Sequence, residues 1–110
     1  MATRDQLRGT LDVLILNTLT SGPRHGYAIG RWLEANSDDE LRVEQGSLYP
    51  ALYRLEARGL IRSRERMSEL GRPAKFYELT AAGRGHLQKE AAEWLSFSRT
   101  VTKLLKGRSS

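Results

Sequence analysis

Apolar residues recur at helical spacing, every three or four positions, in four segments of the chain. The four predicted helices cover about residues 10–20, 25–36, 44–59 and 81–106. Thr10 and Thr80 are suited to capping the first and last helices, because a threonine oxygen can accept a hydrogen bond from a first-turn N–H group. The first helix is apolar on more than one side, so we expect one side to face the core and the other a partner chain.

Between the third and fourth helices the pattern changes to strict alternation, which is typical of strands. Residues 60–67 and 74–79 alternate in this way, and the segment between them is rich in turn-forming residues. A further short strand is predicted at residues 41–43, just before the third helix. Helix, helix, short strand, helix and hairpin is the order of a winged helix-turn-helix, in which the hairpin is the wing.

The third predicted helix combines an apolar stripe with an unusual polar face. Leu48, Leu52 and Leu55 are four and three residues apart and would face the core. The other face presents tyrosines, a proline and an arginine near the N-terminal end, the part that helix-turn-helix proteins insert into the major groove of DNA. The candidate DNA-binding residues on this helix are Gln45, Ser47, Tyr49, Pro50, Tyr53 and Arg54. For Tyr49, a core position with a hydrogen-bonded hydroxyl group is the alternative.

The predicted hairpin carries basic residues. Arg62, Arg64 and Arg66 lie on one face of its first strand. Arg72 and Lys75 are predicted at the tip and are the preferred candidates for contacts with DNA phosphates. A solvated strand face without any ligand would also accommodate these side chains.

The last predicted helix has an apolar seam with alternating steps of four and three residues, the heptad spacing of a coiled coil. The seam is too long for one small domain to cover, so we expect a homodimer in which the first helix also takes part. The expected dimerisation residues are Leu11, Ile15, Leu87, Ala91, Trp94, Val101 and Leu105. In a two-fold dimer, Trp94 and its mate could hold a planar aromatic small molecule between their rings, or Trp94 could simply fill the interface.

The predicted fold is therefore mainly α with a small β-hairpin. A winged helix-turn-helix domain occupies residues 1–80, and one long C-terminal dimerisation helix with its tail occupies residues 81–110. Gly26 and Gly30 are four residues apart on the second helix, so we expect another backbone to approach closely there.

Composition adds a modest positive charge. The 110 residues suffice for one domain with one core. Lys and Arg number 18 and Asp and Glu 13, and the resulting net charge of +5 favours a polyanionic partner. The chain has no cysteine, which excludes disulfides and thiolate metal sites. Because it has neither a membrane-length apolar run nor a signal-peptide-like start, we expect a cytoplasmic protein without a membrane partner.

Catalytic motifs are missing from the sequence. The two histidines, His25 and His86, are far apart and have no carboxylate at ligand spacing. No HExxH zinc motif, phosphate loop or nucleophile elbow is present. We therefore expect no enzyme, no cofactor and no metal, and for His25 we favour a capping or packing role at the start of the second helix.

Several motifs occur in an order that is found in a known family. They are Leu-Asp-Val-Leu-Ile-Leu at 11–16, Gly-Pro-Arg-His-Gly-Tyr at 22–27, Gly-Ser-Leu-Tyr-Pro-Ala-Leu at 46–52, Arg-Leu-Glu at 54–56 with Gly59, and Lys-Phe-Tyr-Glu-Leu-Thr at 75–80 with Gly83-Arg84. On these motifs the chain resembles the PadR family of bacterial transcriptional regulators, and its length is similar to the short subgroup with a single C-terminal helix.

The resemblance implies a homodimer that binds an inverted-repeat operator in double-stranded DNA, usually as a repressor. It implies that the Gly-Ser-Leu-Tyr-Pro helix enters the major groove and that the last helix forms the dimer. Some relatives bind flat aromatic compounds at the dimer centre through a tryptophan, and Trp94 is in a comparable place. Many relatives have a tryptophan in the outgoing wing strand, where this chain has Arg64-Glu65-Arg66, so we expect a more polar wing. The alternative from another class is a winged-helix module that binds proteins.

Overall fold

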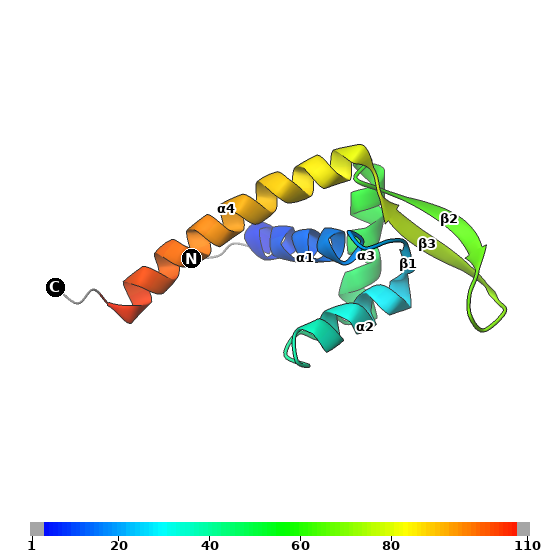
Figure 1. Ribbon diagram of the computed structural model, residues 1–110, viewed down its shortest axis with the longest axis horizontal. Coiled ribbons are helices and arrows are strands. Elements are labelled where there is room, and N and C mark those ends of the chain that lie inside the picture. Colours follow the sequence, from blue (N-terminus) through cyan, green and yellow to red (C-terminus); the bar gives the residue numbers. More distant parts are fainter. Residues whose placement is uncertain (1–3, 108–110) are drawn as a thin grey trace.

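The computed structural model describes residues 4–107 and contains four helices and one small sheet (Figure 1). In chain order the elements are α1 (Arg4–Thr18), β1 (Arg24–His25), α2 (Gly26–Asn36), α3 (Gln45–Ala57), β2 (Ile61–Met67), β3 (Pro73–Leu79) and α4 (Ala81–Lys106). The strands form an antiparallel sheet in the order β1-β3-β2. This arrangement confirms the predicted winged helix-turn-helix with one long C-terminal helix.

Helices α1, α2 and α3 pack around one hydrophobic core. The leucine stripe of α3, formed by Leu48, Leu52 and Leu55, is no more than 2% exposed, and Ile15 and Leu16 of α1 are fully buried beside it. Burying an aliphatic side chain of this size contributes about 1.5–3 kcal/mol to stability. The stripe predicted from the sequence is therefore confirmed, and it decides which face of α3 points to solvent.

The hairpin of β2 and β3 projects away from the helices (Figure 1). The strands pair from Ile61 opposite Leu79 at the base to Met67 opposite Pro73 at the tip. Ile61, Tyr77 and Leu79 are buried at the base, whereas the distal half of β2 is exposed. The hairpin is thus anchored to the core at one end and free to contact a partner at the other.

The third strand lies elsewhere than predicted. Residues 41–43 form no strand, and Leu41 and Val43 instead pack, partly buried, against the core. The third strand is β1, which pairs with β3 opposite Tyr77 and Phe76. A two-residue strand is too short to produce an alternating pattern, so the sequence gives no signal for it.

The first helix begins earlier and ends earlier than predicted. It starts at Arg4 rather than near Thr10 and stops at Thr18, where the threonine hydroxyl donates a hydrogen bond to the carbonyl of Ile15 over 2.7 Å. Its N-terminal part is mostly polar, so apolar periodicity does not reveal it. Residues 1–3 and 108–110 lie outside the described part of the chain.

The last helix is seated on the base of the wing. The hydroxyl oxygen of Thr80 accepts a hydrogen bond from the Gly83 N–H group over 3.0 Å, which confirms the predicted cap. Gly83 is buried so closely that a Cβ atom there would lie 1.9 Å from the carbonyl oxygen of Leu60. From this anchor α4 runs beside α1 and then continues past its end (Figure 1).

Candidate nucleic-acid interface

The outward face of α3 is open to solvent. Gln45, Ser47 and Pro50 are exposed, Tyr49 is 43% exposed and Tyr53 is 76% exposed. All five belong to the set predicted to contact DNA. They form a continuous polar and aromatic face because the leucine stripe turns the opposite side of α3 into the core.

Tyr49 is positioned by a glycine of α2. A Cβ atom on Gly26 would lie 2.8 Å from both the hydroxyl oxygen and a ring carbon of Tyr49, so the ring rests against this glycine. At Gly30, one turn later, the nearest atom is a methyl group of Leu48 at 3.7 Å. The predicted close approach at these glycines therefore exists, but side chains of α3 make it rather than another backbone. One side of the Tyr49 ring packs on α2 and the other remains available.

Arg54 does not belong to the open face. Its Nη2 atom donates a hydrogen bond to a carboxylate oxygen of Asp12 over 3.1 Å, and Asp12 is only 6% exposed. The Nε atom of Arg54 is buried and has no hydrogen-bond partner. The side chain of Arg54 therefore joins α3 to α1, and its contact with DNA stays a prediction. Sequence spacing could not reveal a pair that is 42 residues apart.

The two wing residues predicted to contact phosphates, Arg72 and Lys75, lie in different parts of the hairpin. Arg72 lies in the exposed turn at the tip, where the Ser68 N–H group donates to the Arg72 carbonyl over 2.7 Å. Lys75 is already within β3, and its ammonium group lies 3.7 Å from a carboxylate oxygen of Glu56 on α3. The prediction that Lys75 is at the tip is therefore wrong. Its charge faces the side of the wing that adjoins α3.

The arginines of β2 have partners within the hairpin. Arg62 and Arg64 both donate to one carboxylate oxygen of Glu78, over 2.6 and 3.1 Å. The hydrogen bond from Arg62 is the main reason why the pKa of Glu78 is below its ordinary value. The guanidinium group of Arg66 lies over the ring of Phe76, 4.9 Å from its centroid. These contacts favour the alternative of a solvated strand face for Arg62 and Arg64.

His25 caps α2, as predicted. Its Nδ1 atom accepts a hydrogen bond from the Ala28 N–H group over 3.1 Å, and its ring meets Phe76 edge to face. Two residues that the sequence analysis missed follow on the outer side of this helix. Tyr27 is 57% exposed, and its hydroxyl oxygen accepts a hydrogen bond from Arg31 over 2.9 Å. The available signal was their spacing of four residues outside the apolar stripe of α2.

The predicted seam of α4 separates into a buried and an exposed part. Leu87 is 9% exposed and Ile15 of α1 is completely buried, so these two side chains belong to the core of the single chain and not to a surface that a second chain could cover. Leu11, Ala91 and Val101 are partly buried. Trp94 and Leu105 are 43% and 82% exposed.

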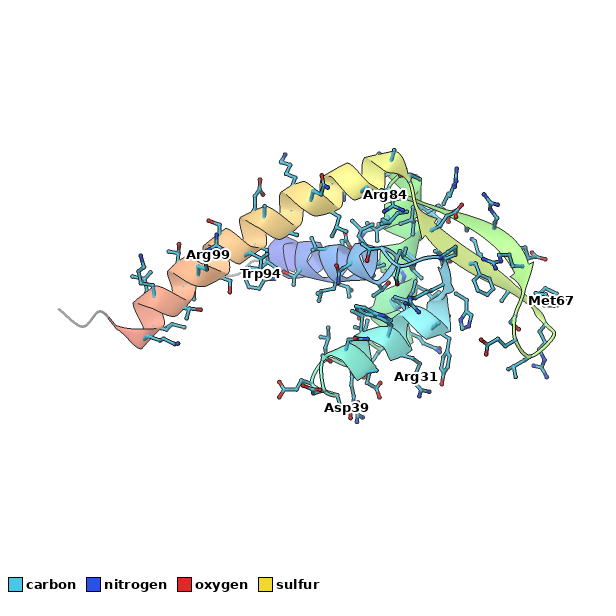
Figure 2. All side chains as sticks on the ribbon, viewed as in Figure 1. Arg31, Asp39, Met67, Arg84, Trp94 and Arg99 are labelled. Carbon is cyan, nitrogen blue, oxygen red and sulfur yellow. The ribbon has the colours of Figure 1, made fainter. Side chains whose placement is uncertain are left out.

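Further apolar side chains widen this exposed surface. Leu95, Phe97 and Leu104 are each more than half exposed, and the rings of Phe97 and Trp94 are 6.2 Å apart. Figure 2 shows Trp94 midway along α4, far from Met67 at the wing. The apolar surface of α4 is thus separate from the face formed by α3 and the wing.

Residues 4–107 offer neither a membrane-spanning helix nor a metal site. No helix in this range is long and apolar enough to cross a membrane. The same range contains no cluster of three or more histidine, cysteine, aspartate or glutamate residues that could hold a metal ion.

Comparisons with known proteins agree on one family. The family model described as "Transcriptional regulator PadR-like family" matches residues 15–89. The transcriptional regulator Rv3488 of Mycobacterium tuberculosis is 40% identical over 73 residues, which cover 66% of this chain and 67% of that protein. The crystal structure of a PadR-like transcriptional regulator from Bacillus cereus has a TM-score of 0.80 at 31% identity, and the match covers 94% of this chain and 99% of that one.

A further relative has a different size. An uncharacterised 37.1 kDa protein in transposon TN4556 of Streptomyces fradiae is 48% identical over 89 residues. The match covers 81% of this chain but only 24% of that protein.

Proposed function

Because the chain belongs to the PadR-like family of transcriptional regulators, which are not enzymes, we propose that it controls transcription by binding double-stranded DNA. The observation that carries the proposal is the open face of α3, where Tyr49 and Tyr53 stand outward while the leucine stripe is buried. In this proposal α3 enters the major groove, and Gln45, Ser47, Tyr49, Pro50 and Tyr53 contact bases or nearby phosphates. Arg72 at the wing tip adds a backbone contact. Acting on the chromosome, the protein works in the cytoplasm.

We further propose that the active species is a homodimer joined through α4. The exposed Trp94, Phe97, Leu104 and Leu105 support this, since contiguous exposed apolar patches mark interaction sites. A two-fold axis would place two copies of α3 in successive major grooves, about 34 Å apart, and would match an inverted-repeat operator. Binding there would repress transcription by blocking polymerase.

The dimer centre is also the proposed place for an effector. Trp94 with its neighbour Phe97 offers two exposed rings that could stack on a planar aromatic molecule. Such a ligand would release the DNA only if it binds more tightly to a dimer whose α3 helices are wrongly spaced. The proposed division of the chain at residue 80 separates these roles, although Gly83 and Leu87 still pack on the winged helix.

The proposal is tested by binding the purified chain to the DNA upstream of its own gene. Salt is titrated and unrelated duplex is added as competitor. We expect tight binding that falls steeply with salt and survives the competitor. Tyr53→Ala should weaken binding to the specific site by about 0.5–1.5 kcal/mol, the contribution of one hydrogen bond, without changing the melting temperature, because Tyr53 is 76% exposed. Gln88→Ala, exposed on α4, is the matched control. If the competitor abolishes binding, the interaction is only the non-specific attraction of a basic protein to a polyanion, and the proposal of a specific regulator fails.

A protein-binding module is the second candidate, and one observation favours it. The wing tip carries apolar side chains in solvent: Met67 is 67% exposed and Leu70 is 85% exposed. If the wing docks onto a protein through them, binding should be nearly independent of salt and Leu70→Ser should weaken it. A steep salt dependence with duplex DNA would reject this candidate.

A further inference from the structure

A groove separates α2 from the wing. It is open to solvent and has a volume of about 1330 Å³, and its walls include Tyr27 and Arg31 on one side and the end of the hairpin on the other. Tyr49 of α3 also lines it, so the groove adjoins the face proposed to enter the major groove. Whatever occupies this groove would therefore lie beside α3 and the wing at the same time.

The lining of the groove is strongly biased toward positive charge. Five of its side chains are arginine or lysine, and a single carboxylate, that of Glu69, opposes them. The five are Arg24, Arg31, Arg66, Arg72 and Lys75. Two of the five already have partners within the chain: the Nε atom of Arg24 donates to the carbonyl of Thr18 over 2.9 Å, and the ammonium group of Lys75 lies 3.7 Å from a carboxylate oxygen of Glu56. The remaining excess fits an extended polyanion better than an isolated anion.

Tyr27 and Arg31 form a ready-made pair of donors on the α2 wall. Arg31 Nη1 donates to the hydroxyl oxygen of Tyr27 over 2.9 Å, so the hydroxyl proton must point elsewhere. An arginine side chain has five N–H donors and no acceptor. The pair therefore offers several further donors to a ligand. The pKa of Arg31 is raised, mainly by its hydrogen bond to Tyr27 and also by the nearby Glu34, so the guanidinium group stays charged.

We propose that Tyr27 and Arg31 bind one backbone phosphate of a DNA strand that runs along this groove between α2 and the wing. The inference rests on the proposed DNA-binding function and assigns a positioning contact to residues outside α3 and the wing tip. A phosphate is the expected ligand because it provides acceptor oxygens for a guanidinium fork. Contacts of this kind place a protein on the duplex and carry no base preference.

The test compares Arg31→Gln with a control that removes the same charge elsewhere. Arg84→Gln is suitable, because Arg84 is exposed near the start of α4, on the far side of the molecule from Arg31 (Figure 2). Affinity for the upstream duplex and for an unrelated duplex is measured against salt by fluorescence anisotropy. Melting curves check that both variants fold, as expected for exposed positions.

Arg31→Gln should reduce the slope of log affinity against log salt by about 0.9, the value for one phosphate contact. If the variant and the native protein bind equally at 1 M salt, this difference in slope makes the affinity of the variant about eightfold lower at 0.1 M salt. The loss should be equal on both duplexes. Tyr27→Phe should weaken binding by a smaller factor than Arg31→Gln, because it removes one hydroxyl donor and no charge. Arg84→Gln should leave the slope of the native protein unchanged.

The outcomes separate this inference from the proposed function. If the native protein binds duplex DNA with a steep salt slope and Arg31→Gln behaves like Arg84→Gln, the groove does not hold the backbone and the inference is wrong. If Arg31→Gln weakens only the specific duplex, Arg31 reads a base and the phosphate assignment fails. If the native protein shows no salt-dependent binding to any duplex, the proposed function itself fails, and an acidic protein segment becomes the better occupant.

Discussion

Gly83→Ala should destabilise the protein, although alanine is the better helix former. The added Cβ atom would lie 1.9 Å from the carbonyl oxygen of Leu60 and 3.2 Å from a methyl group of Leu79. The nearest obstacle is backbone, and it cannot rotate away. The Leu60 carbonyl also accepts the Thr80 N–H group over 3.2 Å, and the Leu60 N–H group donates to Leu55 over 3.0 Å. Relief of the clash must therefore move α4 away from the base of the wing.

Three terms set the size of the effect. Forcing an extra methyl group into a packed contact typically costs about 1–3 kcal/mol. Lengthening the Thr80 to Leu60 hydrogen bond costs about 0.5–1.5 kcal/mol. Replacing a helical glycine by alanine returns about 1 kcal/mol. The net loss is about 0.5–3.5 kcal/mol, which for a chain of this length lowers the melting temperature by roughly 2–14 °C.

Gly85 provides the matched control for this prediction. Apart from its chain neighbours and the backbone of its own helix, nothing lies within 4 Å of a Cβ placed at Gly85, so Gly85→Ala should stabilise the protein by about 1 kcal/mol through helix propensity alone. Thermal and urea unfolding of both variants should be followed at equal protein concentration, because association would shift the transitions. Equal stabilisation by the two substitutions would refute the close seating of α4 on the wing base.

Three further predictions concern the site, the assembly and the response to pH. Gly26→Ala should displace the Tyr49 ring, which lies 2.8 Å from the added Cβ, and should weaken DNA binding more than it lowers the melting temperature; an unchanged affinity would separate Tyr49 from the DNA. Leu105→Glu should give monomers by light scattering with much weaker operator binding, whereas Thr100→Glu, exposed elsewhere on α4, should remain dimeric. The arginine partners of Glu78 favour its carboxylate form and so lower its pKa in the folded protein. The charged Glu78 therefore stabilises the fold above the ordinary glutamate pKa of about 4.3. This stabilisation is lost as the pH falls through the lower pKa of the folded state. Glu78→Gln should therefore flatten the decline of melting temperature below that pH, and a parallel decline in both proteins would contradict the assignment.

The helical part of the fold was predictable because its apolar residues follow one strong period. Leu48, Leu52 and Leu55 fixed the inner face of α3, and the remaining face followed by exclusion. The caps at His25 and Thr80 were also predictable, because capping needs only a suitable side chain a few residues from the N–H group that it accepts. Information of this kind is local in sequence, and single-sequence reasoning recovers it.

The errors concern contacts between residues that are distant in sequence. The pairing of Arg54 with Asp12 on α1 was not predicted, because the two residues are far apart in sequence. An isoleucine such as Ile15 suits the core and a dimer interface equally well. Only the packing of α2 and α3 against α1 shows that Ile15 lies in the core. Tyr27 and Arg31 were missed because two exposed polar residues on a helix carry no signal until the wing is placed opposite them.

The pair of Asp12 and Arg54 bears on how the assembly could control α3. Asp12 is 6% exposed and sits on α1, the helix that also packs beside α4. A partly buried ion pair with its hydrogen bond is costly to break, because each partner would be left with an uncompensated charge. The pair adds a directional contact to the apolar packing between α3 and α1. In a dimer assembled through α4, a change of the angle between the two α4 helices would then carry α1 and α3 along as one body. In the proposed dimer, a rearrangement at its centre would then change the distance between the two α3 helices.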